Sequence, residues 1–404
     1  MSAAQPSGGR ILLATETAFW RRDTGAAQRI ASLCAFVEQR GFQLVVFFPD
    51  RVRRADRDAF HALLPKSRLA TPSFISLATR ALKRRAGALL RRDGLGPASL
   101  PVVLRRPWIR EKQRAFRRLC VQSRPDAVII AYLQMTFLLE GEKLSAWPML
   151  KILDAIDVQS ERALRDPESR GVPAIQPDDE ASALRRYDVV LAIQNREAAI
   201  LKELAPHARV VTVGHALPIT PLPPRRRGSP TALFFAGPAR HNIVALEQLS
   251  REIWPRILNK LPNSRLIIAG GICDAYTEAL PPGVSRVGRV LHPAEAYAQA
   301  DLLLNPVCFG SGLKVKNVEA LAFGMPLLTT PVGAEGLEPG VGSAFLCEEE
   351  PAAFAEAAVQ LLSDPERRRV LSAAALDYAR AHFSEEAAYG ALLDILRGAC
   401  YRES

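Results

Sequence analysis

Short apolar runs alternate with stretches of helical periodicity along most of the chain. In the first half the apolar runs occupy residues 11–14, 44–48, 127–131, 149–153, 189–193 and 210–213. Strands that are apolar on both faces are typical of a parallel sheet covered by helices on both sides. Between the first two runs, the pattern predicts a helix over residues 26–40, with Gly25 in the loop before it and Gly41 directly after it. The buried stripe of this helix is expected to hold Ala27, Ile30, Cys34 and Val37.

A proline-rich stretch interrupts this alternation over residues 217–230. Proline lacks the amide hydrogen that helices and interior strands need, so we predict a linker between domains here. Beyond it, strands are predicted at residues 232–236, 266–269, 284–287, 302–304 and 327–329, and helices near 242–260, 293–300, 314–323, 351–362, 366–382 and 385–399. The predicted fold class is α/β, with two Rossmann-like, doubly wound parallel-sheet domains at residues 1–216 and 231–383 and a C-terminal helix within 384–404.

The bulk composition fits two such domains. The chain has 404 residues, of which 48% are hydrophobic and 24% charged, as is typical of globular proteins. No apolar run reaches the ~18–20 residues that span a bilayer, and the first residues do not form a signal peptide, so we expect a cytoplasmic protein. The six cysteines and six histidines are scattered without ligand spacing. We therefore expect no metal and no bound cofactor.

The net charge of +11 is unevenly distributed. Residues 1–215 hold 35 Lys and Arg against 22 Asp and Glu, and residues 51–118 alone carry 19 basic and 4 acidic side chains. Within residues 73–118 the apolar positions follow helical spacing between arginines. This is typical of a cationic amphipathic helix on anionic lipid or of an ordinary helix with a solvated arginine face; we favour the first, at the inner face of the plasma membrane. Aromatic residues that would stack on bases are sparse, so no nucleic acid is expected.

The most informative chemical pattern follows the apolar run at residues 302–304. A glycine-rich turn over residues 310–312 leads into the helix that is predicted from Lys314. In such a turn, the backbone N–H groups and the positive end of the following helix point outward in the same direction, which favours the binding of a diphosphate. Lys314 and Lys316 add two ammonium groups, and Glu319, about one turn further on, can accept from the two hydroxyls of a ribose. We predict a nucleoside diphosphate here; the alternative is a tight turn before a solvated helix face.

These residues belong to a longer pattern. The chain reads Gly-x-Gly-x-Lys-x-Lys-x-x-Glu-Ala over residues 310–320 and Gly-x-Pro-Leu-Leu-Thr-Thr-x-x-Gly-Ala-Glu-Gly-Leu over residues 324–337. It resembles the retaining family 4 glycosyltransferases of the GT-B fold, the glycosyl transferases group 1. Further similar segments are residues 234–237 with Asn242, residues 266–270, and residues 187–194 with Glu197.

The resemblance implies that a nucleotide-sugar donor binds to the C-terminal domain and an acceptor to the N-terminal domain. Lys314 and Lys316 would bind the donor pyrophosphate and Glu319 the ribose. The donor-binding residues that it implies are Gly25, Gly237, Gly310, Ser311, Gly312, Leu313, Lys314, Lys316 and Glu319. The catalytic residues are expected to be Lys314, Lys316 and Asp157.

The chain departs from the family pattern at two places. Many relatives have a glutamate where this chain has Ser311, which leaves the donor sugar open. Relatives often read Asp-Thr-His-Asp where this chain reads Asp-Ala-Ile-Asp over residues 154–157, so Asp157 becomes the expected polar contact on the acceptor side. Arg29 matches an arginine of the family's first loop, although a surface position on a helix explains it equally well.

The expected function is that of a hexosyltransferase-like enzyme. It would transfer a sugar from a nucleotide-sugar donor to a glycan or lipid-linked acceptor, with the retention that the resemblance implies, in cell-surface polysaccharide synthesis. Because no protein nucleophile can be named, we expect a front-face displacement. The alternatives are a basic nucleic-acid-binding protein and a GT-B sugar-nucleotide isomerase or phosphorylase; neither a lysine-bound cofactor motif nor a paired acid and base supports the latter. The acidic run at residues 178–180 is interpreted as the charge of a helix N-terminus rather than as a metal site.

Overall fold

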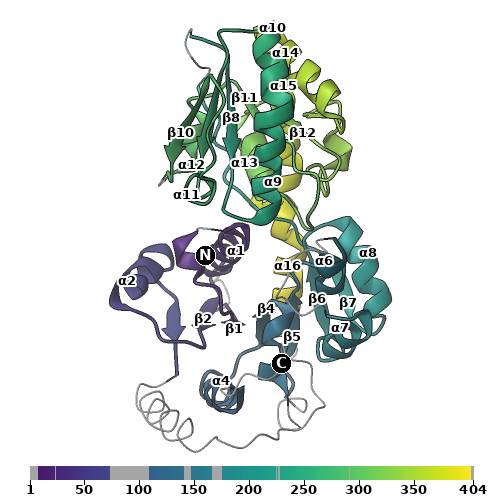
Figure 1. Cartoon of the computed structure of the whole chain (residues 1–404). Coiled ribbons are helices and arrows are strands. Elements are labelled where there is room, and N and C mark those ends of the chain that lie inside the picture. The colour runs from purple at the N-terminus through teal and green to yellow at the C-terminus, as the bar shows by residue number, and fades with distance from the viewer. Residues whose placement is uncertain are drawn as a thin grey trace, which may run out of the picture.

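The computed structural model describes residues 8–22, 24–72, 109–140, 147–165, 175–223, 225, 228–290 and 292–401. These residues form two α/β lobes, one above the other (Figure 1). Each lobe has a parallel sheet with helices on both faces, so the predicted fold class is confirmed.

The described N-terminal lobe contains a seven-stranded parallel sheet in the order β3-β2-β1-β4-β5-β6-β7. Its strands are β1 (Arg10–Ala14), β2 (Gln43–Phe47), β3 (Arg68–Ala70), β4 (Ala127–Ala131), β5 (Leu150–Asp154), β6 (Val189–Ala192) and β7 (Arg209–Thr212). Central β4 reads Ala-Val-Ile-Ile-Ala and is buried at every position, because apolar helices pack on both of its faces. Its helical elements are η1 (Phe19–Arg21), α1 (Gly25–Gln39), α2 (Arg54–Leu63), α4 (Ile109–Ser123), η3 (Leu133–Leu139), α6 (Gln159–Arg165), α7 (Pro177–Leu184) and α8 (Asn195–Leu204).

The described C-terminal lobe repeats the design with the strand order β10-β9-β8-β11-β12-β13. Its strands are β8 (Thr231–Phe235), β9 (Arg265–Ala269), β10 (Val284–Gly288), β11 (Leu302–Asn305), β12 (Leu327–Thr329) and β13 (Leu346–Cys347). Its helical elements are α9 (Arg240–Gln248), the π-helical turn η4 (Leu249–Ile253), α10 (Trp254–Lys260), α11 (Ile272–Ala275), α12 (Pro293–Tyr297), α13 (Val315–Phe323), η5 (Glu338–Gly340), α14 (Pro351–Ser363) and α15 (Pro365–Phe383). Because η4 joins α9 to α10, the pattern over residues 242–260 reads as one helix.

The last helix, α16 (Glu385–Cys400), returns to the N-terminal lobe, as its yellow ribbon shows (Figure 1). Leu392 and Leu396 lie in the core of that lobe, and the ring of Tyr389 packs 5.0 Å from the ring of Phe36 in α1. Residues 217–230, which were predicted as a linker, contact the C-terminal lobe, because Thr220 N donates to Ala322 O at 3.1 Å. The chain therefore passes between the lobes twice, through residues 217–230 and before α16.

The structure corrects two local predictions. Gly25 is not in a loop: it is the first residue of α1, with Thr24 as the N-cap that accepts from Ala27 N. The edge strands β3 and β13 have no counterpart among the predicted strands, because three and two residues give no readable alternation. Gly41 does adopt the left-handed backbone expected after the first helix, with φ of 85°.

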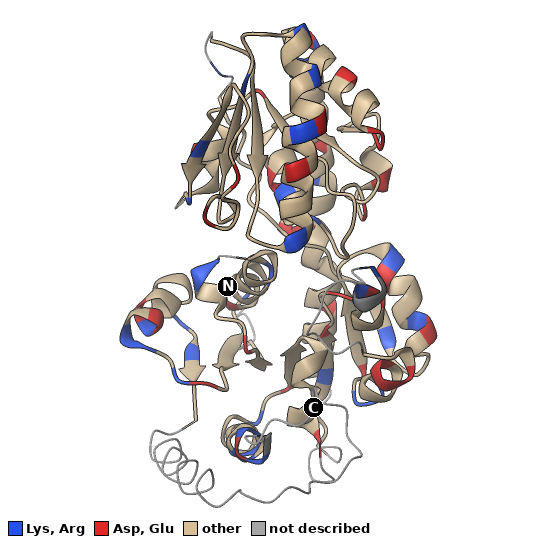
Figure 2. Cartoon of the chain, in the orientation of Figure 1, with Lys and Arg blue, Asp and Glu red and all other residues tan. Residues whose placement is uncertain are grey.

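Of the basic segment 73–118, residues 73–108 lie outside the described residues. The remaining part belongs to α4, whose apolar side chains Phe116 and Cys120 are buried against the sheet. Arg114 and Arg118 are exposed, and basic side chains lie along this helix in Figure 2. The apolar face of α4 is thus part of the core and is not available to lipid.

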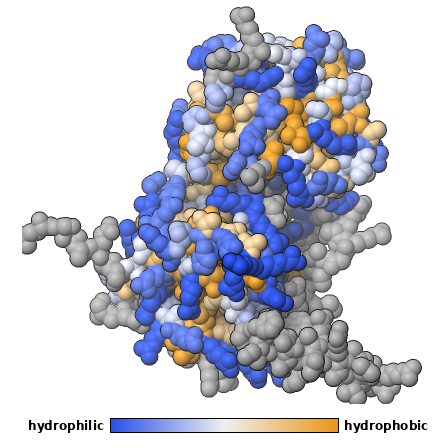
Figure 3. Space-filling model, turned by 90° about the vertical axis from the view of Figure 1, so that its left-hand side faces the viewer, coloured by the Kyte–Doolittle hydropathy of each residue, from blue (hydrophilic) through white to orange (hydrophobic). Residues whose placement is uncertain are grey.

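Most of the described surface visible in Figure 3 is hydrophilic, and hydrophobic side chains are scattered over it. No helix among the described residues is long and apolar enough to cross a membrane.

Candidate functional site

A cavity of about 710 Å³ lies between the lobes. Loops at the carboxyl ends of β1, β4 and β5 line it from one lobe, and loops after β8 and β11 line it from the other. In doubly wound sheets, ligands bind at this edge. All of the predicted site residues line the cavity: Gly25, Asp157, Gly237, Gly310, Ser311, Gly312, Leu313, Lys314, Lys316 and Glu319.

Two helix N-termini meet in this cavity. Gly25 begins α1, Val315 begins α13, and a Cβ atom at Gly25 would lie only 3.1 Å from Val315 Cγ2. The glycine therefore permits a close approach between the two lobes. Since each N-terminus carries unpaired N–H groups and a partial positive charge, their convergence favours an anion.

The glycine-rich turn has the backbone that the sequence predicts. Gly310 and Gly312 have φ angles of 111° and 76°, which favour glycine. A Cβ atom at Gly312 would lie 2.4 Å from Asp157 Oδ1, so a side chain there would collide with this carboxylate of the other lobe. The turn thus brings backbone of the C-terminal lobe against Asp157.

The two lysines are held in separate environments. Lys314 is the N-cap of α13, is buried, and donates from Nζ to Gly312 O at 2.7 Å and to Ser311 O at 3.2 Å. Lys316 Nζ donates to Asn242 Oδ1 at 2.5 Å. Burial lowers the pKa of both lysines, that of Lys316 to about 7, with the charge of Lys314 as the next cause. An anion between them would favour their charged forms.

Glu319 lies on the same helix and is buried. The Tyr297 hydroxyl is 2.9 Å from Lys316 O and 3.3 Å from Glu319 Oε2, and Gln28 of the other lobe also hydrogen-bonds the carboxylate. Burial raises the pKa of Glu319 to about 7, although these hydrogen bonds and Lys316 oppose the shift. The carboxylate is positioned to accept from a ligand's hydroxyl groups.

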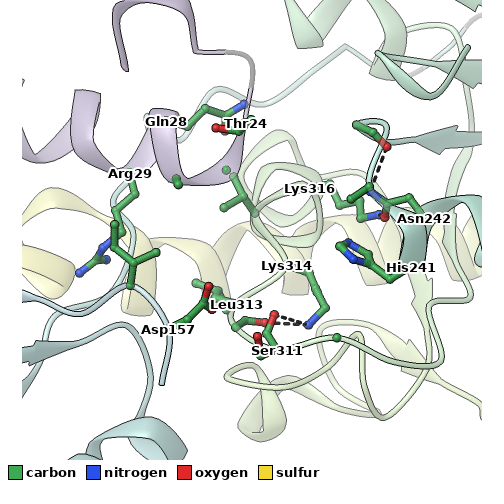
Figure 4. A pocket seen from close by; sticks show the side chains of 18 of the residues that line it. Thr24, Gln28, Arg29, Asp157, His241, Asn242, Ser311, Leu313, Lys314 and Lys316 are labelled. Atoms are coloured by element: carbon green, nitrogen blue, oxygen red, sulfur yellow. Dashed lines mark hydrogen bonds between the residues drawn. The ribbon is translucent and has the colours of Figure 1, made fainter. Parts of the chain in front are cut away.

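On the facing lobe, the side chain of Asp157 is 16% exposed, and its Oδ2 lies 3.6 Å from Arg162. Burial raises the pKa of Asp157, whereas Arg162 and Lys314 oppose the shift. Figure 4 shows Asp157 beside the turn that carries Ser311 and Leu313, with Lys314 on the far side of that turn.

Arg29 is not a surface residue, so that alternative is wrong. Its side chain is fully buried and donates to Asp154 Oδ1 at 2.6 Å and to Gly214 O at 2.7 Å. In Figure 4 its guanidinium points away from the two lysines. A buried, bidentate pair of this kind fixes α1 to β5 and to the segment after β7. Arg29 therefore stabilises the position of α1 beside the cavity.

Known proteins resemble this chain in the sequence of one domain and in the fold. Residues 230–364 match the family model described as Glycosyl transferases group 1. Over 126 residues the chain is 24% identical to an uncharacterised 44.6 kDa protein in the cps region of Klebsiella pneumoniae; the alignment covers 29% of this chain and 32% of the relative. The chain thus aligns with about a third of that relative's length.

Similar solved structures cover nearly the whole chain. Sucrose-phosphate synthase from Thermosynechococcus elongatus has a TM-score of 0.72 and 15% identity, with 96% of this chain and 98% of that chain covered. TarM has a TM-score of 0.69 and 9% identity over 96% and 98% of the two chains. Anabaena HepE in complex with UDP and glucose has a TM-score of 0.63 and 12% identity over 96% and 100%. The chain therefore has a GT-B fold that carries a glycosyl transferases group 1 domain, which supports a GT-B glycosyltransferase.

The matched residues include the turn, both lysines and Glu319, whereas Gly25 and Asp157 lie outside the match. The acidic run at residues 178–180 is at the N-terminus of α7, and Glu180 accepts from Gln159 N and Ser160 N at 3.0 and 2.8 Å. Within the described ranges, no group of three or more His, Cys, Asp or Glu side chains could hold a metal.

Tyr132, Arg162 and His241 are among the cavity-lining residues that sequence reasoning missed. The His241 ring lies 3.6 Å from the position of a Cβ atom at Gly310, and burial lowers its pKa to about 3, followed by the effect of Lys316. It is therefore neutral near pH 7 and can accept as well as donate. Its position next to Asn242, in the first turn after the β8 loop, is the signal that could have found it.

Proposed function

We propose that this protein is a glycosyltransferase that moves a sugar from a nucleotide-sugar donor to a glycan or lipid-linked acceptor. The observation that carries the proposal is the convergence of two helix N-termini, Lys314 and Lys316 at one end of the cavity, with Glu319 one turn further on. Positive charge beside a carboxylate matches a nucleoside diphosphate, with the phosphates near the lysines and the ribose near Glu319.

In this proposal the diphosphate is the leaving group. Negative charge develops on it as its bond to the anomeric carbon breaks, and the two ammonium groups and the helix N-termini stabilise that charge. The acceptor hydroxyl approaches from the N-terminal lobe, where Asp157 faces the glycine-rich turn. We propose retention of configuration by a front-face displacement, in which the acceptor attacks from the side on which the diphosphate leaves.

The molecules bound in similar structures support the proposed substrate classes. HepE structures are described in complex with UDP-glucose, and an S. aureus TarM mutant in complex with fondaparinux, alpha-GlcNAc-glycerol and UDP. The relative from the cps region supports a role in cell-surface polysaccharide synthesis. We place the protein in the cytoplasm, with residues 73–108 as the part that would contact an anionic inner membrane face.

The test is incubation of the purified protein with a panel of nucleotide sugars, with and without EDTA, and detection of the released nucleoside diphosphate and sugar by mass spectrometry. We expect release from at least one donor, at an unchanged rate in EDTA, and a strong reduction in Lys316→Ala. Nuclear magnetic resonance of the first-formed product reports its anomeric configuration. No release from any donor would refute the proposal, and an inverted product would refute retention alone.

A further inference from the structure

Two neighbouring strands of the N-terminal lobe end in strained backbone at the cavity. β4 and β5 pair in parallel, with Ala131 opposite Asp154. Tyr132 follows directly with φ of 74°, and Ile156 follows two residues after β5 with φ of 63°. A positive φ is uncommon for a residue other than glycine and is an outlier for a β-branched one. Such conformations cluster at functional sites, where the surrounding structure enforces them.

Backbone hydrogen bonds hold both residues in place. Tyr132 N donates to Asp154 O at 3.0 Å, and Ala155 N donates to Leu191 O at 3.1 Å. Asp157 N donates to Ala155 O at 2.7 Å across Ile156, which makes a γ-turn of the rare, positive-φ kind. The chain reverses within three residues, and the next side chain after the turn is that of Asp157.

The result is a small polar niche. Tyr132, Ile156, Asp157 and Arg162 all line the cavity. Asp157 Oδ1 lies where a side chain at Gly312 would be, and its Oδ2 lies 3.6 Å from the half-exposed guanidinium of Arg162. Burial raises the pKa of Tyr132, followed by the effect of Asp157, so the phenol keeps its proton near pH 7. The niche therefore offers a hydroxyl donor and a carboxylate acceptor that line the same cavity.

We infer that Tyr132, Asp157 and Arg162 bind the attacking hydroxyl of the acceptor, and that the Tyr132 phenol donates to its oxygen while Asp157 accepts from it. The niche belongs to the N-terminal lobe, whereas Lys316 and Glu319 belong to the C-terminal lobe. During transfer the acceptor oxygen bonds to the anomeric carbon, the bond from that carbon to the diphosphate breaks, and the diphosphate leaves as its anion. The hydroxyl proton passes to the Asp157 carboxylate that accepts its hydrogen bond. Tyr132 keeps its proton and acts as a positioning residue.

This inference rests on the proposed function and is tested with Tyr132→Phe, which keeps the ring and removes the hydroxyl. With UDP-glucose as donor and octyl glucoside as acceptor probe, we expect the acceptor KM to rise by about 2- to 13-fold, the effect of one lost hydrogen bond. The donor KM and the dissociation constant of UDP should not change. Arg162→Gln should raise the acceptor KM in the same way, because Arg162 orients Asp157.

Two matched control variants separate an effect on acceptor binding from an effect on protein stability. Tyr187→Phe removes another buried phenol, bonded to Thr136 Oγ1 at 2.8 Å, and should lower the melting temperature without changing the acceptor KM. Arg185→Gln removes an exposed arginine of the same lobe and should change neither. If Tyr132→Phe leaves the acceptor KM unchanged, the niche is refuted. Unchanged UDP binding in Lys316→Ala would instead refute the proposed donor site, so the failure of the niche and the failure of the proposed function can be distinguished.

Discussion

UDP binding should be coupled to the uptake of a proton by Lys316. Its ammonium group is enclosed between Asn242 Oδ1 at 2.5 Å and the ring of Phe234, whose centroid is 5.5 Å away. Burial, and then the charge of Lys314, lowers the pKa of Lys316 to about 7 in the free protein. A bound diphosphate favours the charged form and returns the pKa toward its ordinary value.

The size of the effect follows from these values. At pH 8, one unit above its pKa, about a tenth of Lys316 is charged, so binding should take up about 0.9 proton. Glu319, whose pKa is about 7, is then already ionised and releases only about 0.1 proton when it binds the ribose. Because the complex binds more protons than the free protein, the affinity for UDP should fall by nearly tenfold for each pH unit above about 8.

The assay is titration calorimetry of UDP binding at pH 8 in two buffers with different ionisation enthalpies. The difference between the observed enthalpies gives the number of protons taken up. In Lys316→Met the uptake should disappear and the affinity should fall, whereas Lys202→Met, at an exposed lysine of α8, should behave as the wild type. Equal enthalpies in both buffers, with normal wild-type affinity, would refute this account of Lys316.

Three further predictions concern separate parts of the chain. Lys314→Ala should weaken UDP binding by about 10- to 150-fold, the loss of one charge-assisted hydrogen bond of about 1.5–3 kcal/mol, with unchanged circular dichroism; wild-type affinity would argue against a phosphate contact. The pKa of Glu319 is raised from 4.5 to about 7, so the native state holds a proton that the unfolded chain has lost, and wild-type stability should fall as pH rises from 4.5 to 7. Thermal melts of Glu319→Gln should lack this part of the pH dependence, and an identical dependence in both proteins would assign it to other groups. Replacing Arg84, Arg85, Arg91 and Arg92 with Gln should reduce co-sedimentation with anionic liposomes at low salt and leave donor hydrolysis unchanged; equal pelleting with neutral liposomes would exclude electrostatic docking.

The fold and the glycine-rich side of the cavity were predictable because their signals are local. Buried parallel strands such as β4 are continuous apolar runs, and a run of that kind is readable without knowledge of its neighbours. Gly310, Gly312 and Lys314 are adjacent in the sequence, so one segment carries both the turn and the charge. The edge strands β3 and β13 were missed because they are too short to show a strand pattern and form only by pairing with a neighbouring strand.

The acceptor side was less predictable because its residues follow different strands. Tyr132 comes after β4 and Asp157 after β5, and only the parallel pairing of these strands brings them to one edge. The positive φ angles of Tyr132 and Ile156 leave no signal in the sequence, because a residue of either type looks the same there whatever its backbone conformation. Arg29 shows the same limit, since a helical arginine reads as exposed until its buried partner Asp154 is known.

The contact between the lobes could not be predicted from the sequence either. Glu335 lies within the recognised pattern of residues 324–337, yet in the structure it accepts from Arg165 and Arg196 of the other lobe, each at 2.8 Å. It also favours the charged form of Lys314. Since Arg165 ends α6, the helix that carries Arg162, one carboxylate connects the donor lysine to the helix beside Asp157. The two halves of the proposed site are therefore linked by charge, and a change in the approach of the lobes alters both the diphosphate end and the acceptor niche.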